Sequence, residues 1–308
     1  MPSEPLLPIR EVARQTGVNP VTLRAWERRY GLLEPGRTSK GHRLYSPEQV
    51  QRVQAILRWL ERGASVGQVR ALLDNERQAP APTLQGDWPA RCQQLIDAIG
   101  NLAQRPLDQQ LNQAMALYPA VTLCERLLLP VLDALAKRWQ RSFNAQLEQV
   151  FFHSWLRSKL GARIYHNNHS LEGPAVLLAS TGEQAFDAHL WLCAWLISSS
   201  GYPVEILEWP VAGSQLREAV RQLQPRALVM SLGRRLDMPE LQRSLPLIDL
   251  PMLLSGSTLP IHQADLQALQ LPGLTCSTPL RRRCTGCNDC AMPLYRRPSF
   301  HATDLAAQ

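Results

Sequence analysis

The spacing of apolar residues changes abruptly at Pro174, and this change restricts the folds that the chain can adopt. From Trp88 to about Tyr165, apolar residues recur with the helical period of about 3.6 residues, which predicts a helical bundle. Beyond Pro174, short apolar runs alternate with helical stretches. This alternation predicts parallel strands joined by helices that cover both faces of a sheet, which is a doubly wound α/β arrangement.

Pro and Gly residues and the lengths of the apolar runs place the boundaries of these elements. We expect roughly four helices before Pro174, with breaks near Arg105-Pro106, Tyr118-Pro119 and Ser142-Phe143. After it we expect strands in AVLLAS (175–180), VEILEW (204–209) and ALVMSLG (227–233), with helices at 184–200 and 214–223. The Pro-rich segment 76–87 predicts a linker in front of the bundle.

The first 75 residues contain a shorter helical pattern. Leu7 to Thr16 has helical periodicity, and Gly17 predicts a tight turn after it. Asn19 is a good N-cap, and Pro20 suits the first position of a second helix that ends near Tyr30. Two helices separated by a tight turn, the second of them rich in Thr and Arg, predict a helix-turn-helix.

The segment after this second helix predicts a β-hairpin, or wing. It contains Gly31, Pro35, Gly36 and Gly41 within residues 31–45. A third helix is expected from Ser46-Pro47-Glu48 to about Arg62, and a short fourth helix from Ser65 to Leu73. The N-terminal domain is therefore predicted to be a winged helix-turn-helix.

The polar residues of this domain predict contact with double-stranded DNA. On the second helix, the residues expected to enter the major groove are Asn19, Thr22, Arg24 and, one turn later, Arg28. On the wing, the residues expected to bind phosphate oxygens are Arg37, Lys40, His42, Arg43 and Tyr45. Trp26 is expected to pack in the core, between the helices and the wing.

Positive charge is concentrated at the two ends of the chain, whose formal net charge is +7. Residues 1–76 contain 12 Lys/Arg and 8 Asp/Glu, and residues 281–297 contain 5 and 1. The 16 basic and 16 acidic residues of 77–280 balance. This distribution favours a polyanionic partner bound mainly by the N-terminal domain.

The sequence IREVARQTGVNPVTLRAWERRYGLLEPGRTSKGHRLYS resembles the DNA-binding domain of the MerR family of transcriptional regulators. The resemblance extends over residues 8–73 and includes the VTLRAWE core, the GLLEP exit and the arginine and tyrosine of the wing. It implies a homodimer on a two-fold operator, an indirect effect on RNA polymerase, and promoter distortion.

The bundle and α/β domain behind such a DNA-binding domain resemble the branch of this family that contains the cobalamin-dependent CarH/LitR light sensors and MlrA. In the light sensors, a Trp, nine residues and a Glu-His pair cover the upper face of the cofactor. Here Trp139 is present, but the pair falls on Gln149 and Val150, and His153 comes three residues late.

The second cobalamin signature is an acidic residue, a spacer, the cobalt-binding His, two spacers and Gly. Asp187 and His189 match its beginning, but Leu192 stands at the Gly position. Counting back from Gly201 places Phe186 where the ligand should be. A helical His among large apolar residues is typical of a packed or surface residue, so we predict that cobalamin is not bound.

Two alternatives to a regulator without cobalamin remain open. One is a cobalamin-dependent light-sensing regulator, and the other is a corrinoid-dependent enzyme or methyl carrier; the enzyme hypothesis would need His189 to bind cobalt. The sequence contains no Ser/His/Asp constellation, useful carboxylate pair or phosphate-binding Gly loop, which disfavours an enzyme. The input is predicted to be a ligand, a redox state or a partner, including a separate sensor or photoreceptor protein.

Four cysteines crowd into the segment CSTPLRRRCTGCNDC, residues 276–290. Cys284, Cys287 and Cys290 have the spacing C-x2-C-x2-C, and Cys276 lies eight residues upstream. Such thiolates can converge on an iron–sulfur cluster or a tetrahedral zinc ion. A thiol–disulfide switch is the third alternative, since neighbouring arginines lower thiol pKa values, and a loose tail with incidental cysteines is the fourth.

These observations predict the organisation of the whole chain. The expected segments are 1–75 (winged helix-turn-helix), 76–87 (linker), 88–168 (bundle), 172–280 (Rossmann-like, cobalamin-binding-type domain) and 281–308 (basic, Cys-rich tail). The longest apolar run is too short to cross a bilayer, and no secretory signal opens the chain, so a cytoplasmic location without membrane contact is expected.

Overall fold

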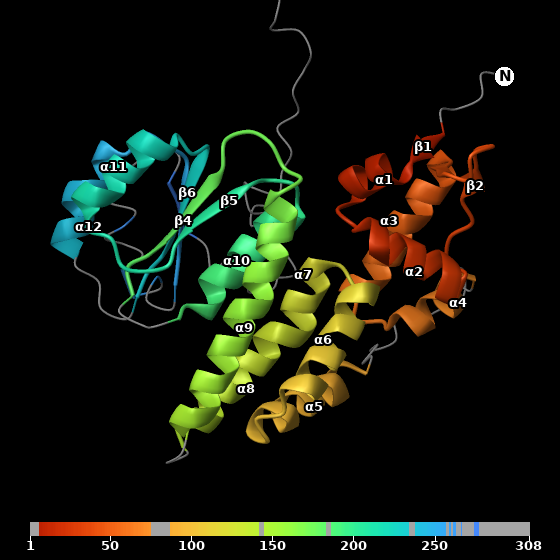
Figure 1. Cartoon of the computed structure of the whole chain (residues 1–308), viewed down its shortest axis with the longest axis horizontal. Coiled ribbons are helices and arrows are strands. Elements are labelled where there is room, and N and C mark those ends of the chain that lie inside the picture. The colour runs from red at the N-terminus through yellow and green to blue at the C-terminus, as the bar shows by residue number, and fades with distance from the viewer. Residues whose placement is uncertain are drawn as a thin grey trace, which may run out of the picture.

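The computed structural model describes residues 6–74, 87–141, 145–182, 186–233 and 238–256, together with 259, 261–262, 266 and 274–276. The N-terminal helices, the helical bundle and the sheet domain lie side by side in that order (Figure 1). In this described part of the chain, no helix is both long and apolar enough to span a membrane.

The N-terminal part is a winged helix-turn-helix, as the sequence predicts. It contains β1 (Leu7–Pro8), α1 (Ile9–Thr16), α2 (Pro20–Tyr30), β2 (Gly36–Arg37), β3 (Arg43–Tyr45), α3 (Pro47–Glu61) and α4 (Val66–Asp74). Gly17 makes the tight turn with a left-handed φ of 73°. The Asn19 side chain accepts a hydrogen bond from the backbone N–H of Val21 at 2.8 Å, which caps α2.

The predicted wing is an antiparallel hairpin. Strands β2 and β3 pair through Arg37 and Arg43, and the short sheet has the order β1-β3-β2. At the tip, the backbone N–H of Thr38 donates to the carbonyl oxygen of His42 at 2.9 Å. The wing therefore leaves the end of α2 and returns to α3 as a closed loop.

The bundle consists of α5 (Trp88–Gly100), α6 (Gln104–Leu117), α7 (Ala120–Leu123), a π-helical turn (Cys124–Leu128), α8 (Leu129–Trp139) and α9 (Ala145–Asn168). The first predicted break is wrong by a few residues, because Pro106 lies in the first turn of α6, where no intrahelical N–H is needed. The π turn comes just before Pro130, which cannot donate to the carbonyl of Arg126. The Cys92 thiol donates to that oxygen at 3.6 Å instead.

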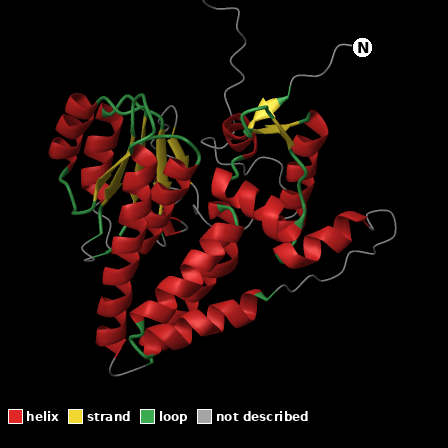
Figure 2. Ribbon diagram, turned by 45° about the vertical axis from the view of Figure 1, so that its right-hand side comes forward, coloured by secondary structure: helices red, strands yellow, loops and turns green. Residues whose placement is uncertain are grey.

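The α/β domain is a parallel sheet with the strand order β5-β4-β6-β7-β8. Its elements are β4 (Val176–Ser180), α10 (Ala188–Ser199), β5 (Val204–Leu207), α11 (Gly213–Leu223), β6 (Ala227–Ser231), α12 (Met238–Ser244), a 3-10 turn (Leu245–Leu247), β7 (Met252–Ser255) and β8 (Leu274–Cys276). Helices cover both faces of the sheet (Figure 2). Strand order reverses between β4 and β6, which makes their carboxyl ends the switch point of the sheet.

Helix α10 joins the sheet to the bundle. Its sequence, AHLWLCAWLISS, is apolar almost all round, which is typical of a helix buried on several sides. It packs along α9 on one side and against β4 and β5 on the other. One apolar core consequently runs from the N-terminal helices through the bundle to one face of the sheet, and a second core lies under the opposite face.

Candidate functional site

The face of α2 that points to solvent is basic. Arg24 and Arg28 are exposed one helical turn apart, and Lys40 and His42 are exposed on the wing. Asn19 is exposed too, although its side-chain oxygen caps α2. Within the described residues, Arg24, Arg28 and Lys40 have no acidic partner. Their charges are therefore available to an anionic ligand.

Three of the predicted DNA-contact residues lie inside the domain instead. Thr22 is 1% exposed and Tyr45 is fully buried, because both face the core formed by the helices and the wing. Burial raises the pKa of the Tyr45 phenol. Only 11% of the Arg43 side chain is exposed. The predictions that Thr22 and Tyr45 reach DNA are corrected on this ground, and Arg43 has a structural partner.

That partner is Glu27, which the sequence analysis did not single out. Its carboxylate accepts a hydrogen bond from Arg37 at 2.9 Å and also binds Arg43, so α2 and the wing are joined by ion pairs. The hydrogen bond from Arg43 to Glu27 raises the pKa of the Arg43 guanidinium. The sequence feature that could have pointed to Glu27 is an acidic residue within a basic helix, directly after the buried Trp26. The pairs hold the wing at a defined angle to α2.

Trp26 links the DNA-binding domain to the bundle. Its ring is buried as predicted, but its indole N–H donates to the backbone oxygen of Leu117, the last residue of α6, at 2.9 Å. At the same interface, the N–H of Val66 donates to the Tyr118 hydroxyl at 3.5 Å. Helix α2 thus carries exposed arginines on one face and contacts α6 through the other.

A chain of aromatic rings fills the interface between the bundle and the sheet domain. The ring centroids of Trp139 and His153 are 5.6 Å apart, those of His153 and Phe186 are 5.2 Å apart, and those of Phe186 and Trp191 are 6.2 Å apart. Phe186 is buried, and burial lowers the pKa of His153. The rings come from α8, α9, the loop before α10 and α10 itself.

The structure places the other predicted cobalamin positions away from this interface. Gln149 and Val150 are exposed on α9, and His153 is the α9 residue that meets the sheet domain. His189 is exposed in the first turn of α10. The Asp187 carboxylate caps α10 by accepting from the N–H groups of His189 and Leu190, both at 3.1 Å, and also binds the Ser231 hydroxyl.

The loops at the switch point of the sheet touch each other. A Cβ atom on Gly233 would lie only 2.6 Å from the Cα atom of Gly182, so the glycine permits close backbone contact. The N–H of Gly233 also donates to the Thr181 hydroxyl at 3.1 Å. These contacts close the space between the residues that directly follow β4 and β6.

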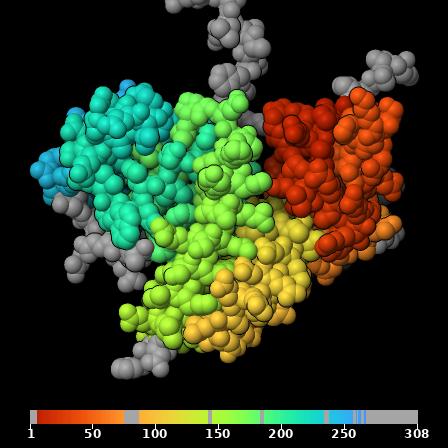
Figure 3. All heavy atoms as spheres, in the orientation of Figure 1, coloured from red at the N-terminus to blue at the C-terminus, as the bar shows by residue number. Residues whose placement is uncertain are grey.

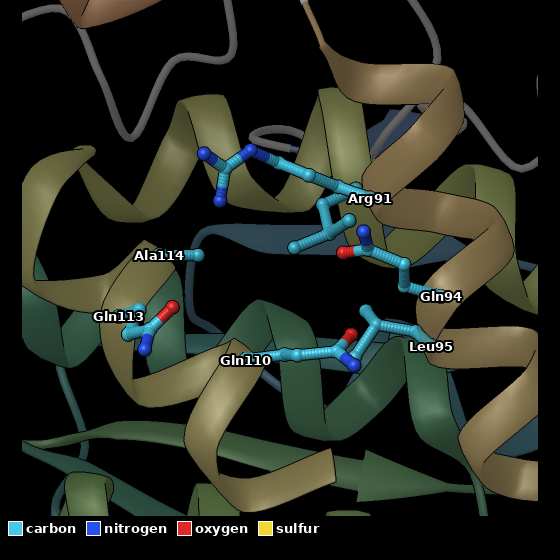
Figure 4. Close-up of a pocket in the computed structure, with 7 residues that line it drawn as sticks. Arg91, Gln94, Leu95, Gln110, Gln113 and Ala114 are labelled. Carbon is cyan, nitrogen blue, oxygen red and sulfur yellow. The ribbon is translucent and has the colours of Figure 1, made fainter. Parts of the chain in front are cut away.

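A small pocket lies elsewhere, within the bundle (Figure 4). It is lined by residues of α5, α6 and the π turn: Arg91, Gln94, Leu95, Gln110, Gln113, Ala114 and Leu127. Its cavity volume is only about 30 Å³, which is far below the usual range of ligand sites. Nothing in its lining connects it to the aromatic interface.

The predicted cysteine site lies largely outside the part of the chain that the structure describes. Cys284, Cys287 and Cys290 are outside the described residues, and only the backbone of Cys276 is described, in β8. Among the described residues, no group of three or more His, Cys, Asp or Glu side chains is arranged to hold a metal ion. Cys124 and Cys193 are buried and Cys92 is half-buried, and burial raises the pKa of Cys193 to about 12.

Comparison with known proteins identifies the family. Residues 7–76 match the family described as MerR HTH family regulatory protein, and residues 91–164 match the B12 binding domain. The regulator MlrA of Escherichia coli K12 is 31% identical over 204 residues, which cover 66% of this chain and 79% of MlrA. The chain belongs to the MerR family.

Two MerR-family repressors of Myxococcus xanthus are also similar. CarA is 27% identical over 230 residues, covering 74% of this chain and 77% of CarA, and CarH is 23% identical over 282 residues, covering 85% and 92%. A solved cobalamin-binding protein of Desulfitobacterium hafniense is 15% identical, and the match covers 60% of this chain and 92% of that protein. Its TM-score is 0.30.

Proposed function

We propose that this MerR-family regulator binds duplex DNA through Arg24 and Arg28 of α2 and through the wing, and that its bundle and sheet domains receive a signal without cobalamin. The observation that carries the first part is the pair of exposed arginines on one face of α2, one turn apart and without an acidic partner among the described residues. A helix that presents such groups fits the major groove, where arginine binds guanine bidentately.

The wing extends this basic surface. Lys40 and His42 at its tip are exposed and suit phosphate oxygens on the flank of the groove. Arg37 lies beside them, with its charge partly balanced by Glu27 at 2.9 Å. Because phosphate contacts release counterions, affinity for DNA should fall steeply with salt concentration.

Arg24→Ala tests the DNA-binding face. Duplexes enriched from a random library by the wild-type protein serve as probes, and fluorescence anisotropy measures their affinity. We expect Arg24→Ala to weaken binding by about 1–3 kcal/mol. Arg29→Ala is the matched control, since Arg29 is exposed on the same helix but lies off the Arg24–Arg28 face. Equal affinities of wild type and Arg24→Ala would contradict the assignment.

The residues at the bundle–sheet interface do not fit a corrin ring. A flat ring held between two side chains needs roughly 7 Å between them, which is two van der Waals contacts. The centroids of His153 and Phe186 are only 5.2 Å apart. Phe186 also has no lone pair to offer cobalt, and His189 lies outside the interface on the exposed first turn of α10.

Mixing with adenosylcobalamin in the dark tests this part of the proposal. After desalting we expect no cobalamin absorbance with the protein and no light-dependent change in its oligomeric state. Stoichiometric cobalamin that is lost in His189→Ala would show that the sheet domain rearranges to use that histidine. The alternative function, a cobalamin-dependent light sensor, would then replace the proposal.

The signal then has to arrive by another route, as a ligand, a redox change or a separate sensor protein. The cysteines Cys276, Cys284, Cys287 and Cys290 remain our candidates for an iron–sulfur cluster, a zinc site or a thiol switch. Anaerobic purification followed by metal analysis and a visible spectrum distinguishes the two metal sites from each other and from metal-free thiols. Iron with sulfide supports the cluster, one colourless zinc ion supports the second, and four titratable thiols without metal exclude both.

A further inference from the structure

The outer face of α9 has no charged side chain. Counting one residue on every turn along the side opposite the core gives Leu147, Val150, Ser154, Ser158, Ala162 and Tyr165. All six are exposed, and the exposed fractions of Leu147, Val150 and Tyr165 are 63%, 56% and 76%. Solvent-facing sides of helices normally carry charged and polar residues, so a long uncharged face on a surface helix indicates a contact surface.

The order of residues along this face is self-complementary. Positions equally distant from residue 156 carry matching types: Leu147 with Tyr165, Val150 with Ala162, and Ser154 with Ser158. Large side chains stand at both ends and small ones in the middle. A second copy of α9, laid antiparallel with the same centre, would therefore place its small residues against small residues and its large apolar residues at both ends.

The charges beside the face are compatible with a second copy. Arg157, on one flank, is held by Glu208 of the sheet domain at 2.6 Å, so this flank presents a neutralised pair. Trp209, which directly follows Glu208 in the sequence, is exposed and adds apolar surface to the same flank. On this flank, two copies would consequently meet without bringing unpaired like charges together.

The position of the DNA-binding domain agrees with this arrangement. In Figure 1, α9 lies at the front of the molecule, its long axis runs from top to bottom, and the DNA-binding domain lies to its right. Figure 3 shows α9 on the near surface, with no other described segment in front of it. A two-fold axis perpendicular to α9 in the plane of the picture would keep both DNA-binding domains on the same side, as a two-fold operator requires.

We propose that the outer face of α9 is the dimer interface of this regulator, formed with α9 of a second copy in antiparallel orientation about a two-fold axis near residue 156. This inference rests on the proposed binding of duplex DNA, at the two-fold operator that the family resemblance implies. It names the surface that brings the two DNA-binding domains together, with Ser154 opposite Ser158 of the second copy.

Ser154→Glu tests the interface through the oligomeric state of the full chain. The carboxylate would be buried at the centre of the dimer without a cation opposite it, so we expect the dimer dissociation constant from sedimentation equilibrium to rise by on the order of 100-fold. Ser214→Glu is the matched control, because Ser214 is exposed on α11 far along the chain from α9. A wild-type chain that is monomeric, or a dimer that Ser154→Glu leaves intact, would overturn the proposal.

A double variant, Val150→Cys with Ala162→Cys, tests the orientation. The two positions lie about 18 Å apart on one helix, too far for a disulfide within a chain, but opposite each other across the proposed axis. We expect a disulfide between chains and no such link in either single variant. Mass spectrometry should identify it as a peptide containing position 150 of one chain joined to a peptide containing position 162 of the other.

Two other patterns of linkage would contradict the proposal. Links between position 150 of one chain and position 150 of the other would indicate parallel helices. Links from either introduced thiol to the tail cysteines would show that the chain's own C-terminal segment covers α9.

DNA binding separates this inference from the proposed function. Arg24→Ala should remain a dimer and lose affinity for DNA. Ser154→Glu should lose affinity for the full operator while it keeps weak binding to a half-site. If Ser154→Glu dissociates the dimer and Arg24→Ala has no effect on DNA affinity, the interface stands and the proposed DNA contacts fail.

Discussion

The DNA-binding face and the bundle–sheet interface contrast in what their side chains leave available. On α2, Arg24 and Arg28 are exposed to solvent. The nearby Arg37 and Arg43 of the wing instead form ion pairs with Glu27. Between bundle and sheet, Trp139, His153 and Phe186 pack against one another. Both regions occur in a chain that matches the MerR and B12 binding families. The contrast teaches that proteins of one family can share a backbone arrangement, whereas the side chains at a site determine whether a ligand can bind there.

The physical difference lies in what fills the space at each place. An exposed guanidinium is hydrated and can exchange its water for phosphate or a base edge at low cost. The packed rings of Trp139, His153 and Phe186 leave no space between them for water that a ligand could replace. A ligand could enter only if these rings separated, and their buried apolar contacts would then be lost.

Phe186→Ala should have the largest effect on stability. Phe186 is 5% exposed, and removal of its ring leaves a cavity between His153 and Trp191. We expect a loss of about 3–5 kcal/mol in the free energy of unfolding, measured by urea titration. Leu223→Ala, at a half-exposed position on α11, is the control and should cost far less. A small loss in Phe186→Ala would mean that the interface is loosely packed, and the argument against cobalamin would weaken with it.

Glu27→Ala should have the next largest effect, on the other side of the comparison. It would leave the nearly buried Arg43 without its carboxylate, at a cost of about 2 kcal/mol in the free energy of unfolding. Glu27→Gln keeps a hydrogen-bond acceptor and should cost less. Thermal unfolding of both variants checks this order. Equal stability of Glu27→Ala and the wild type would show that the wing does not depend on these ion pairs.

Trp26→Phe should have a smaller effect, of about 1 kcal/mol, because it removes one neutral hydrogen bond and retains most of the buried ring. The lost bond is the one between the indole of α2 and the oxygen of Leu117. Trp139→Phe is the matched control, since that indole donates to Glu148 within the bundle. If the α2–α6 contact joins the two regions, only Trp26→Phe should speed amide exchange in both α2 and the end of α6.

The smallest expected effect is a dependence of the free energy of unfolding on pH, caused by His153. Burial lowers its pKa below the ordinary value, so between the two values the unfolded chain binds more protons than the folded one. Stability should be complete above about pH 6.5 and should decrease as the pH falls through that window. His153→Gln should flatten this part of the urea-unfolding profile. An unchanged profile would assign the pH dependence to other groups.

Much of the fold was predictable because its signals are local. The cap of α2 at Asn19, the turn at Gly17 and the hairpin after Gly31 depend on residues a few positions apart. The bundle and the first strands were predictable from hydrophobic period. Strand β7 was missed, since a four-residue buried run without alternation carries little signal of its own.

The candidate sites depended on the tertiary structure to a greater degree. The sequence placed Thr22 on the second helix and Arg43 and Tyr45 on the wing, and predicted DNA contacts for all three, but packing turns them inward. The cobalamin signature, counted along the sequence, falls on Gln149 and Val150, which do not match it and are exposed, and α9 turns His153 toward Phe186 instead. A shift of a few residues on a helix changes the face on which a side chain lies, and the sequence does not say which face meets a neighbour.

The sequence by itself therefore determined the kinds of element, their order and the basic character of α2. Only the tertiary structure decided which basic groups stay free, that Glu27 binds two of the others, and that Trp26 reaches an oxygen 91 residues away. The reason is physical. Helix caps, turns and hydrophobic period act through neighbours along the chain, whereas burial and ion pairing depend on which surfaces meet when distant segments pack together.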